Sequence, residues 1–153
     1  MNLRSRSLAA ALSAIALAMP ALAADKFVAN PLGFKWDEKP AYMPKGAKVA
    51  RLSGDPSKAG PFAVMIKFPA SYKWPAHWHS QDQQFTIVSG RLYVGRGDAP
   101  EADATETAKA GSYFYMPAKT HYYAYTRTNV MFQVHGMGPL DFNYVDPKDD
   151  PRK

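Results

Sequence analysis

Two histidines, His77 and His79, stand two residues apart in the segment Pro75–Gly90. On a β-strand, residues i and i+2 point to the same face, so the two imidazoles can converge on one point. A pair of imidazoles is a common beginning of a site for a borderline transition metal. The alternative is that both rings are exposed to solvent on a loop.

The residues that follow the pair extend the candidate site. Gln83 lies four residues after His79, and Phe85 and Ile87 share the parity of Gln83. If Gln83 points inward on a strand, Phe85 and Ile87 point inward as well. The result would be a polar mouth above an apolar floor, which is the usual profile of a small-molecule site.

A second segment, Gly111–Tyr122, echoes the first further along the chain. Together the two segments resemble the cupin family. Its first motif runs from a glycine through His-x-His and a glutamate to a second glycine, and its second motif runs from a glycine through Pro-x-Gly to a histidine. The matching residues in this chain are His77, His79, Gly90, Gly111 and Pro117. The resemblance covers roughly residues 62–145, which is most of the chain that would remain after residues 1–23 are removed.

The chain departs from the family pattern at three positions. Gln83 stands where the family has its metal-binding glutamate, and Lys119 replaces the glycine of Pro-x-Gly. The family's third histidine falls at Tyr122, while His121 comes one residue early. The usual site of three histidines and one glutamate is therefore present only in part.

The resemblance implies one divalent transition metal (Cu, Zn, Fe, Ni or Mn) held by His77, His79 and one or two of Gln83, His121 and Tyr122. A neutral amide in place of a carboxylate should weaken Mn²⁺ most and Cu²⁺ or Zn²⁺ least. Two alternatives stay open. Tyr122 is either a ligand or an aromatic residue of the core or pocket, and His121 is either a ligand or a rim residue turned away by the one-residue slip.

His135 is the fourth histidine of the chain and precedes Gly136. If Met131, Gln133 and His135 face inward, His135 can bind a substrate or act as an acid or base. The alternative is a structural histidine held by hydrogen bonds.

Apolar segments recur at intervals of about ten residues, a spacing typical of a sandwich or barrel. The predicted strands are 48–52, 62–68, 85–88, 91–95, 111–116, 122–126, 130–135 and 140–145, with short strands at 33–36 and 105–107. The sequence therefore predicts an all-β fold, with a hairpin that turns at Ser89-Gly90. The cupin resemblance implies a double-stranded β-helix, that is, a jelly-roll barrel.

The chain divides into four parts. Residues 1–23 have the charged start, short apolar run and small-residue site of a secretory signal peptide. Cleavage near Ala23 would deliver the protein to the periplasm or the medium without a stable membrane anchor; a buried or anchoring N-terminal helix is the alternative. An extended N-terminal arm and first strand (24–60) precede the barrel (61–146) and a charged tail (147–153). Arms of this kind in cupins imply a homodimer.

Composition excludes several classes of protein. The 153 residues include no cysteine, which excludes disulfides, thiolate metal sites and thiol nucleophiles. The net charge of +6 is not gathered into basic runs, so we expect no nucleic-acid partner. No glycine-rich phosphate loop is present.

Three functions remain open at this point. The first is a metal-dependent cupin enzyme, of oxygenase or isomerase type, acting on a small oxygenated molecule. The second is a cupin that binds a sugar or an aromatic acid without catalysis and without a stoichiometric metal. The third is a metal-binding or structural periplasmic protein. A fold alone does not choose among them.

Overall fold

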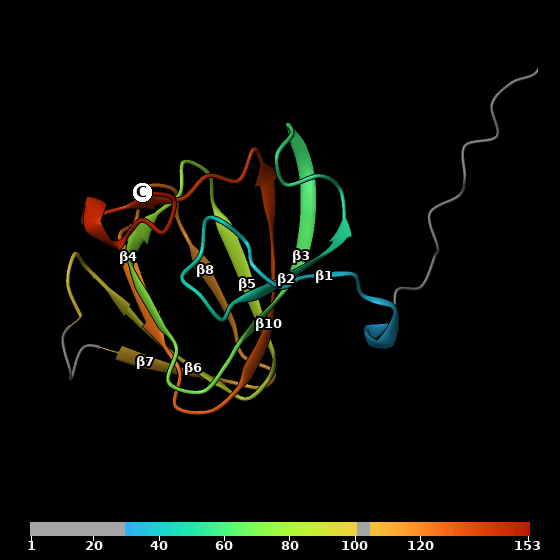
Figure 1. Ribbon diagram of the computed structural model, residues 1–153, viewed down its shortest axis with the longest axis horizontal. Helices are drawn as coiled ribbons and strands as arrows, with labels where there is room; N and C mark the ends of the chain where they lie inside the picture. The colour runs from blue at the N-terminus through green and yellow to red at the C-terminus, as the bar shows by residue number, and fades with distance from the viewer. Residues whose placement is uncertain (1–29, 101–104) are drawn as a thin grey trace, which may run out of the picture.

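The structure is a computed structural model that describes residues 30–100 and 105–153 (Figure 1). The signal peptide predicted for residues 1–23 lies outside the described residues. Within those residues, no helix has the length and apolar character needed to cross a bilayer.

Two antiparallel sheets face each other, as the sequence predicted for an all-β jelly-roll fold (Figure 1). The six-stranded sheet has the order β1 (Trp36–Asp37), β2 (Lys48–Ser53), β3 (Gly60–Phe68), β10 (Val130–Gly138), β5 (Gln83–Ser89) and β8 (Tyr113–Met116). The five-stranded sheet has the order β11 (Asn143–Tyr144), β4 (Lys73–Trp78), β9 (Tyr122–Tyr125), β6 (Arg91–Arg96) and β7 (Thr105–Lys109).

The hydrophobic core fills the space between the two sheets. Alternate residues of each strand point into this space because successive side chains of a strand point to opposite faces. In β3 and β10 the inward residues are Phe62, Val64, Ile66, Phe68, Val130, Phe132 and Val134, all buried. The Phe68 ring contacts those of Tyr72 and Phe132, with centroids 4.1 and 5.0 Å away. This packed interior fixes which face of each strand is available to a site.

The predicted hairpin across Ser89-Gly90 is wrong. β5 pairs with β10 and β8, whereas β6 pairs with β9 and β7, so the turn carries the chain from one sheet to the other. Gly90 has a φ of 78°, and a Cβ at this position would lie 2.2 Å from the carbonyl oxygen of Asn129. The glycine therefore marks a tight corner between layers, a role that local sequence does not distinguish from a hairpin turn.

The strand that carries His77, β4, contains a β-bulge. Its register with β9 shifts between Trp74, which opposes Ala124, and His77, which opposes Tyr122. The extra residue lets Trp74 and His77 both face the interior although they are three residues apart. Their ring centroids lie 4.2 Å from each other. Because the bulge breaks the alternation of apolar residues, the sequence did not show a strand here.

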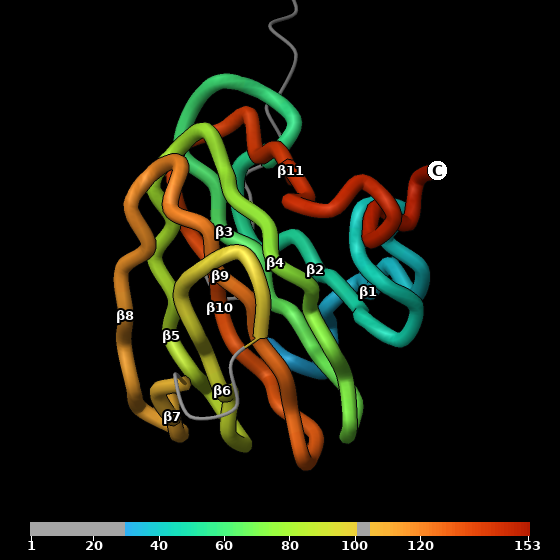
Figure 2. The backbone as a smooth tube through the Cα atoms, turned by 90° about the vertical axis from the view of Figure 1, so that its left-hand side faces the viewer, coloured from blue at the N-terminus to red at the C-terminus, as the bar shows by residue number. Residues whose placement is uncertain are grey.

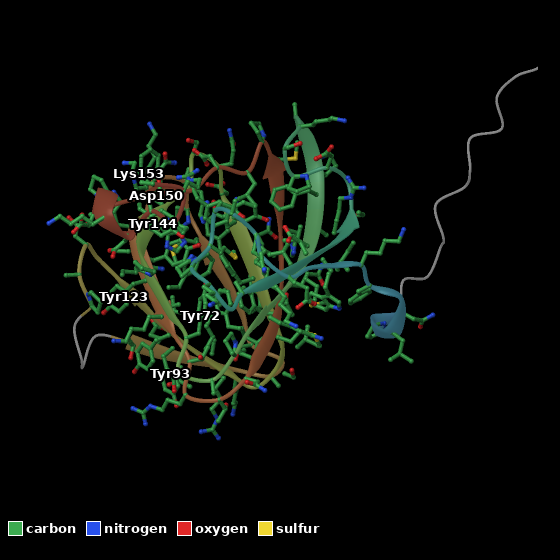
Figure 3. The ribbon with its side chains drawn as sticks, in the orientation of Figure 1. Tyr72, Tyr93, Tyr123, Tyr144, Asp150 and Lys153 are labelled. Carbon is green, nitrogen blue, oxygen red and sulfur yellow. The ribbon has the colours of Figure 1, made fainter. Side chains whose placement is uncertain are left out.

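The chain is joined to the barrel near both ends of the described residues, by strand pairing at one end and by a hydrogen bond at the other. The predicted strand at 33–36 is a 3₁₀ turn, Pro31–Gly33, followed by β1, which pairs with β2. At the other end, Pro147–Asp149 forms a 3₁₀ turn, and Arg152 Nη2 donates a hydrogen bond to the Phe142 carbonyl over 2.8 Å. Figure 3 shows Tyr144, Asp150 and Lys153 gathered at this corner of the molecule. The charged tail is thus tied to the barrel.

Candidate metal centre

Four side chains that the sequence singled out lie in the barrel interior. His77 is 0%, Gln83 1%, Tyr122 1% and His79 4% exposed. The ring centroids of His77 and His79 are 5.2 Å apart, and the Tyr122 ring lies 4.3 Å from that of His77 and 5.8 Å from that of His79. The strand ends at β4, β5 and β9 therefore bring two imidazoles, a phenol and an amide to the same enclosed interior.

Both imidazoles are held through the same ring nitrogen. His77 Nδ1–H donates to the carbonyl oxygen of Pro75 over 2.7 Å, and His79 Nδ1–H donates to the carbonyl oxygen of Asp141. Burial lowers the pKa of both histidines below the usual 6.5, so the rings are neutral. In a neutral imidazole with a protonated Nδ1, the lone pair is on Nε2. In both rings Nε2 is therefore the nitrogen whose lone pair could bind a cation.

The Nε2 atoms differ in their contacts. His79 Nε2 accepts a hydrogen bond from the Tyr122 hydroxyl over 2.9 Å. His77 Nε2 is buried and has no hydrogen-bond partner, and the same is true of Gln83 Nε2. Buried polar atoms without partners are uncommon in folded proteins. Trp74 Nε1 lacks a partner as well. Of these three interior nitrogens only His77 Nε2 has a free lone pair, because the Gln83 and Trp74 nitrogens are N–H donors, so His77 Nε2 is the atom that a cation could complete.

Asp141 positions His79 through its backbone. Its carboxylate accepts hydrogen bonds from Ser80 N (2.8 Å), Ser80 Oγ (2.5 Å) and Asn143 Nδ2 (2.7 Å). Burial acts to raise the pKa of Asp141, but these hydrogen bonds outweigh it and leave the pKa below its usual value. The anchored loop in turn presents the Asp141 carbonyl to His79 Nδ1.

The turn before β9 is tied to the loop after β4. Ala118 N donates a hydrogen bond to Asp82 Oδ1, and Lys119 N donates one to the His79 carbonyl oxygen; each donor–acceptor distance is 2.8 Å. Lys119 has a φ of 62°, a left-handed conformation that glycine adopts more readily. Lys119 thus adopts the left-handed conformation at the position where the family pattern has a glycine. The two hydrogen bonds hold Tyr122 beside His79.

The structure places His121 outside this group. Its Nδ1 contacts Asp98 Oδ1 at 2.5 Å, its side chain is 37% exposed, and its ring stacks on Trp78 at 6.4 Å. The one-residue offset from Tyr122 turns His121 to the outer face of the sheet. Among the described residues, no group of three or more histidine, cysteine, aspartate or glutamate side chains is placed to hold a metal.

His135 also lies outside the barrel. Val134 points into the core, so His135 faces the outer side of β10, where its Nε2 donates to Gln84 Oε1 over 2.9 Å. The inward orientation considered for Met131, Gln133 and His135 is wrong because Val130, Phe132 and Val134 occupy the inner face.

Phe85 and Ile87 lie in the core, each 1% exposed. The Phe85 ring stacks on Phe114 at 4.5 Å and meets the Tyr122 ring edge-on at 6.0 Å. They form the apolar floor expected beneath Gln83.

Three residues of the site escaped sequence reasoning. Trp74 and Phe142 pack on the histidine rings, with centroids 4.2 Å from His77 and 4.8 Å from His79 respectively. The contact of Asp141 with His79 spans 62 positions of the chain. A single sequence carries no signal for a contact between a side chain and a backbone carbonyl that far apart.

The jelly-roll fold and the enclosed His-x-His pair define a cupin. The family model described as the ChrR cupin-like domain matches residues 25–141, and the chain belongs to this family. No curated protein matches the chain.

Three solved structures illustrate the shared fold. The polyketide cyclase RemF from Streptomyces resistomycificus has a TM-score of 0.66 and 16% identity, over 82% of this chain and 89% of that chain. A protein from Methylibium petroleiphilum, described as a candidate acetylacetone dioxygenase, has a TM-score of 0.63 and 21% identity, over 87% and 90%. An RmlC-like cupin from Shewanella frigidimarina has a TM-score of 0.58 and 18% identity, over 74% and 91%.

Proposed function

We propose that this protein is a metal-binding cupin that holds one divalent transition metal through His77 Nε2 and His79 Nε2, with the Gln83 amide as a further ligand. The metal would polarise or hold a small oxygenated molecule. Two fold neighbours are described as a cyclase and a candidate dioxygenase, and at 16% and 21% identity they show a shared fold that hosts such reactions.

One observation carries the proposal: both Nδ1–H groups donate to backbone carbonyls. Histidines that bind metals almost always donate the second ring nitrogen to a carbonyl, carboxylate or water, which fixes the tautomer and orients the ring. Here the arrangement leaves two Nε2 lone pairs inside the barrel, and the buried Nε2 of His77 has no partner. The donor set therefore fits a metal ion.

The donor set favours ions that accept neutral nitrogen ligands. Two imidazoles and an amide bring no negative charge, so Cu²⁺ and Zn²⁺ should bind more tightly than Mn²⁺. A bound ion of this kind supplies Lewis acidity to an oxygen atom of a ligand. The rings of Trp74 and Phe142 pack on the histidine rings, and Phe85 meets the Tyr122 ring, so the donor atoms have aromatic surroundings.

Metal analysis together with thermal unfolding tests the proposal. Binding to the folded state alone stabilises the protein by about 2.7 kcal/mol when the free ion exceeds its dissociation constant a hundredfold. We expect one Zn²⁺ or Cu²⁺ per chain, a lower melting temperature in chelator, and loss of both effects in His77→Gln and His79→Gln.

The two histidines outside the barrel provide matched controls. His121→Gln and His135→Gln remove the same chemical group but should keep full metal binding, since His121 contacts Asp98 and His135 contacts Gln84. If all four variants bind metal equally, or if the wild-type protein binds none, the proposal fails. The second result would favour the metal-free cupin that binds a small ligand.

Export and homodimer formation remain predictions from the sequence. The predicted cleavage site near Ala23 precedes the described residues, and the dimer depends on a second copy of the chain. N-terminal sequencing and light scattering of the exported protein test them directly.

A further inference from the structure

A cavity opens at the seam between the two sheets. It has a volume of about 340 Å³, which lies within the range of small-molecule sites. Its walls come from β6, β7 and β8, with Ser112 in the turn that joins β7 to β8. β7 and β8 are the edge strands of their sheets, and Figure 2 shows them along one side of the molecule. The seam is thus an opening toward the barrel interior.

The floor of this cavity adjoins the candidate metal centre. Met116 lines the cavity and is the direct cross-strand partner of Gln83. Phe114 lines it as well and stacks on Phe85, whose ring meets that of Tyr122. Cross-strand partners on one face have side chains in contact range. A molecule in the cavity would therefore lie one side chain away from the donor residues.

One cation stands at the rim of the cavity. Arg96, the last residue of β6, lines the cavity and is the cross-strand partner of Tyr122. Within the part of the chain that the structure describes, Arg96 has no ion pair. A guanidinium group can bind a carboxylate through two parallel hydrogen bonds.

The rest of the lining is mixed, with polar groups from Thr107, Ser112, Tyr113 and Tyr115 beside an apolar wall. Val94, Ala108, Phe114 and Met116 supply the apolar wall, and the hydroxyl of Ser112 accepts a hydrogen bond from Lys109 N, which leaves its proton free to donate. Glu106 is the single acidic residue of the lining, and it pairs across the strands with Val94 rather than with Arg96.

We infer that this seam cavity binds a small monocarboxylate with an apolar or aromatic body, whose carboxylate is bound by Arg96 and whose body lies on Phe114 and Met116. The inference rests on the proposed function and extends it by naming the class of ligand that binds beside the metal centre. Arg96 is a binding residue in this role. The carboxylate of Glu106 weakens binding because it repels the carboxylate of the ligand.

Benzoate and its neutral analogue benzamide test the charge recognition, because they have nearly the same shape. Titration of the protein with each probe by NMR should show saturable benzoate binding, with the shifted amides in β6, β7 and β8, and benzamide binding about tenfold weaker. Arg96→Gln should weaken benzoate about tenfold and leave benzamide unchanged. Glu106→Gln should tighten benzoate about threefold.

Arg91→Gln is the matched control. Arg91 begins the same strand, is exposed, and has the opposite parity to Arg96, so it faces away from the cavity. The substitution Arg91→Gln removes the same charge as Arg96→Gln and should leave benzoate binding unchanged. Equal losses in the two arginine variants, or no saturable binding of benzoate, would overturn the inference.

Zn²⁺ binding measured on the same variants separates this inference from the proposed function. Arg96→Gln should bind Zn²⁺ normally, since Arg96 is not a metal ligand. Arg96-dependent benzoate binding by a chain that binds no Zn²⁺ would refute the metal and keep the carboxylate site. Normal Zn²⁺ binding without any effect of Arg96→Gln on benzoate would refute the carboxylate site alone.

Discussion

At the scale of single residues, the hydroxyl of Tyr122 decides how easily a metal reaches His79. Burial raises the pKa of Tyr122 well above its usual value, so the phenol stays neutral and donates to His79 Nε2. A metal that binds this nitrogen must break the hydrogen bond. Tyr122 then competes with the metal rather than ligating it.

Tyr122→Phe should consequently tighten metal binding. A neutral hydrogen bond is worth about 1 kcal/mol, which corresponds to an affinity gain of about fivefold. Titration with Zn²⁺ and Cu²⁺ by calorimetry measures the change. A loss of affinity, accompanied in the wild-type Cu²⁺ complex by a phenolate absorption band, would show instead that Tyr122 is a ligand.

Gln83 controls which metal is preferred. Gln83→Glu restores the carboxylate of the family pattern at a position that is 1% exposed. Because hard ions gain most from an anionic oxygen, we expect Mn²⁺ and Fe²⁺ affinity to rise more than Cu²⁺ affinity. Competition titrations against a chelator give the three affinities. An equal change for all three ions would show that Gln83 does not contact the metal.

The same substitution has a cost without metal. A carboxyl group buried without a partner is destabilising in its charged form. Metal-free Gln83→Glu should therefore unfold at a lower temperature than the wild-type protein. Added Mn²⁺ should raise the melting temperature of the variant and so remove this difference.

At the scale of elements, the site depends on hydrogen bonds among three connecting segments, each of which joins a strand of one sheet to a strand of the other. The turn before β9 is tied to the loop after β4 by Ala118 N and Lys119 N, and the loop after β10 is tied to Ser80 through Asp141. These backbone hydrogen bonds act together with the direct hydrogen bond between the Tyr122 hydroxyl and His79 Nε2 to set the position of Tyr122 relative to His79.

Lys119→Gly should stabilise this turn. A left-handed conformation costs a residue with a Cβ about 1–2 kcal/mol, of which the greater freedom of glycine in the unfolded chain offsets roughly 0.5–1 kcal/mol. The net gain is about 0.5–1 kcal/mol, measured by urea unfolding. Lys119→Ala, which keeps the Cβ, is the control and should be close to neutral. Destabilisation by the glycine would mean that the lysine side chain itself holds the turn.

At the scale of the whole molecule, the buried histidines couple folding to pH. The pKa of both His77 and His79 is lowered by burial in the folded state, whereas an unfolded histidine has a pKa of about 6.5. Below pH 6.5 the unfolded chain therefore binds protons that the folded chain does not. The free energy of unfolding should therefore decrease as the pH falls below about 6.5. Above this pH the two histidines are neutral in both states and have no effect on it.

Urea unfolding in chelator between pH 5 and pH 7.5 measures this coupling. We expect the free energy of unfolding to fall below pH 6.5 by up to about 1.4 kcal/mol per pH unit for each histidine. His77→Gln should show a shallower slope over the same window. Identical slopes for the wild-type protein and His77→Gln would contradict the assignment.

The sequence by itself determined the class of fold and the centre of the site. Apolar alternation within β3, β5 and β10 is a local property, and it follows from the requirement that one face of each strand be buried. The two-residue spacing of His77 and His79 is equally local, and their ring centroids lie 5.2 Å apart, although β4 ends at Trp78 and His79 begins the loop that follows.

The tertiary structure alone decided the sheet to which each strand belongs and the partners of each site residue. Ser89-Gly90 is compatible with a hairpin or a corner, and only the pairing of β5 with β10 and of β6 with β9 separates them. His79 meets Tyr122 across 43 positions and Asp141 across 62. Contacts at such separations depend on the register between strands, and one bulge in β4 is enough to change which side chains face inward.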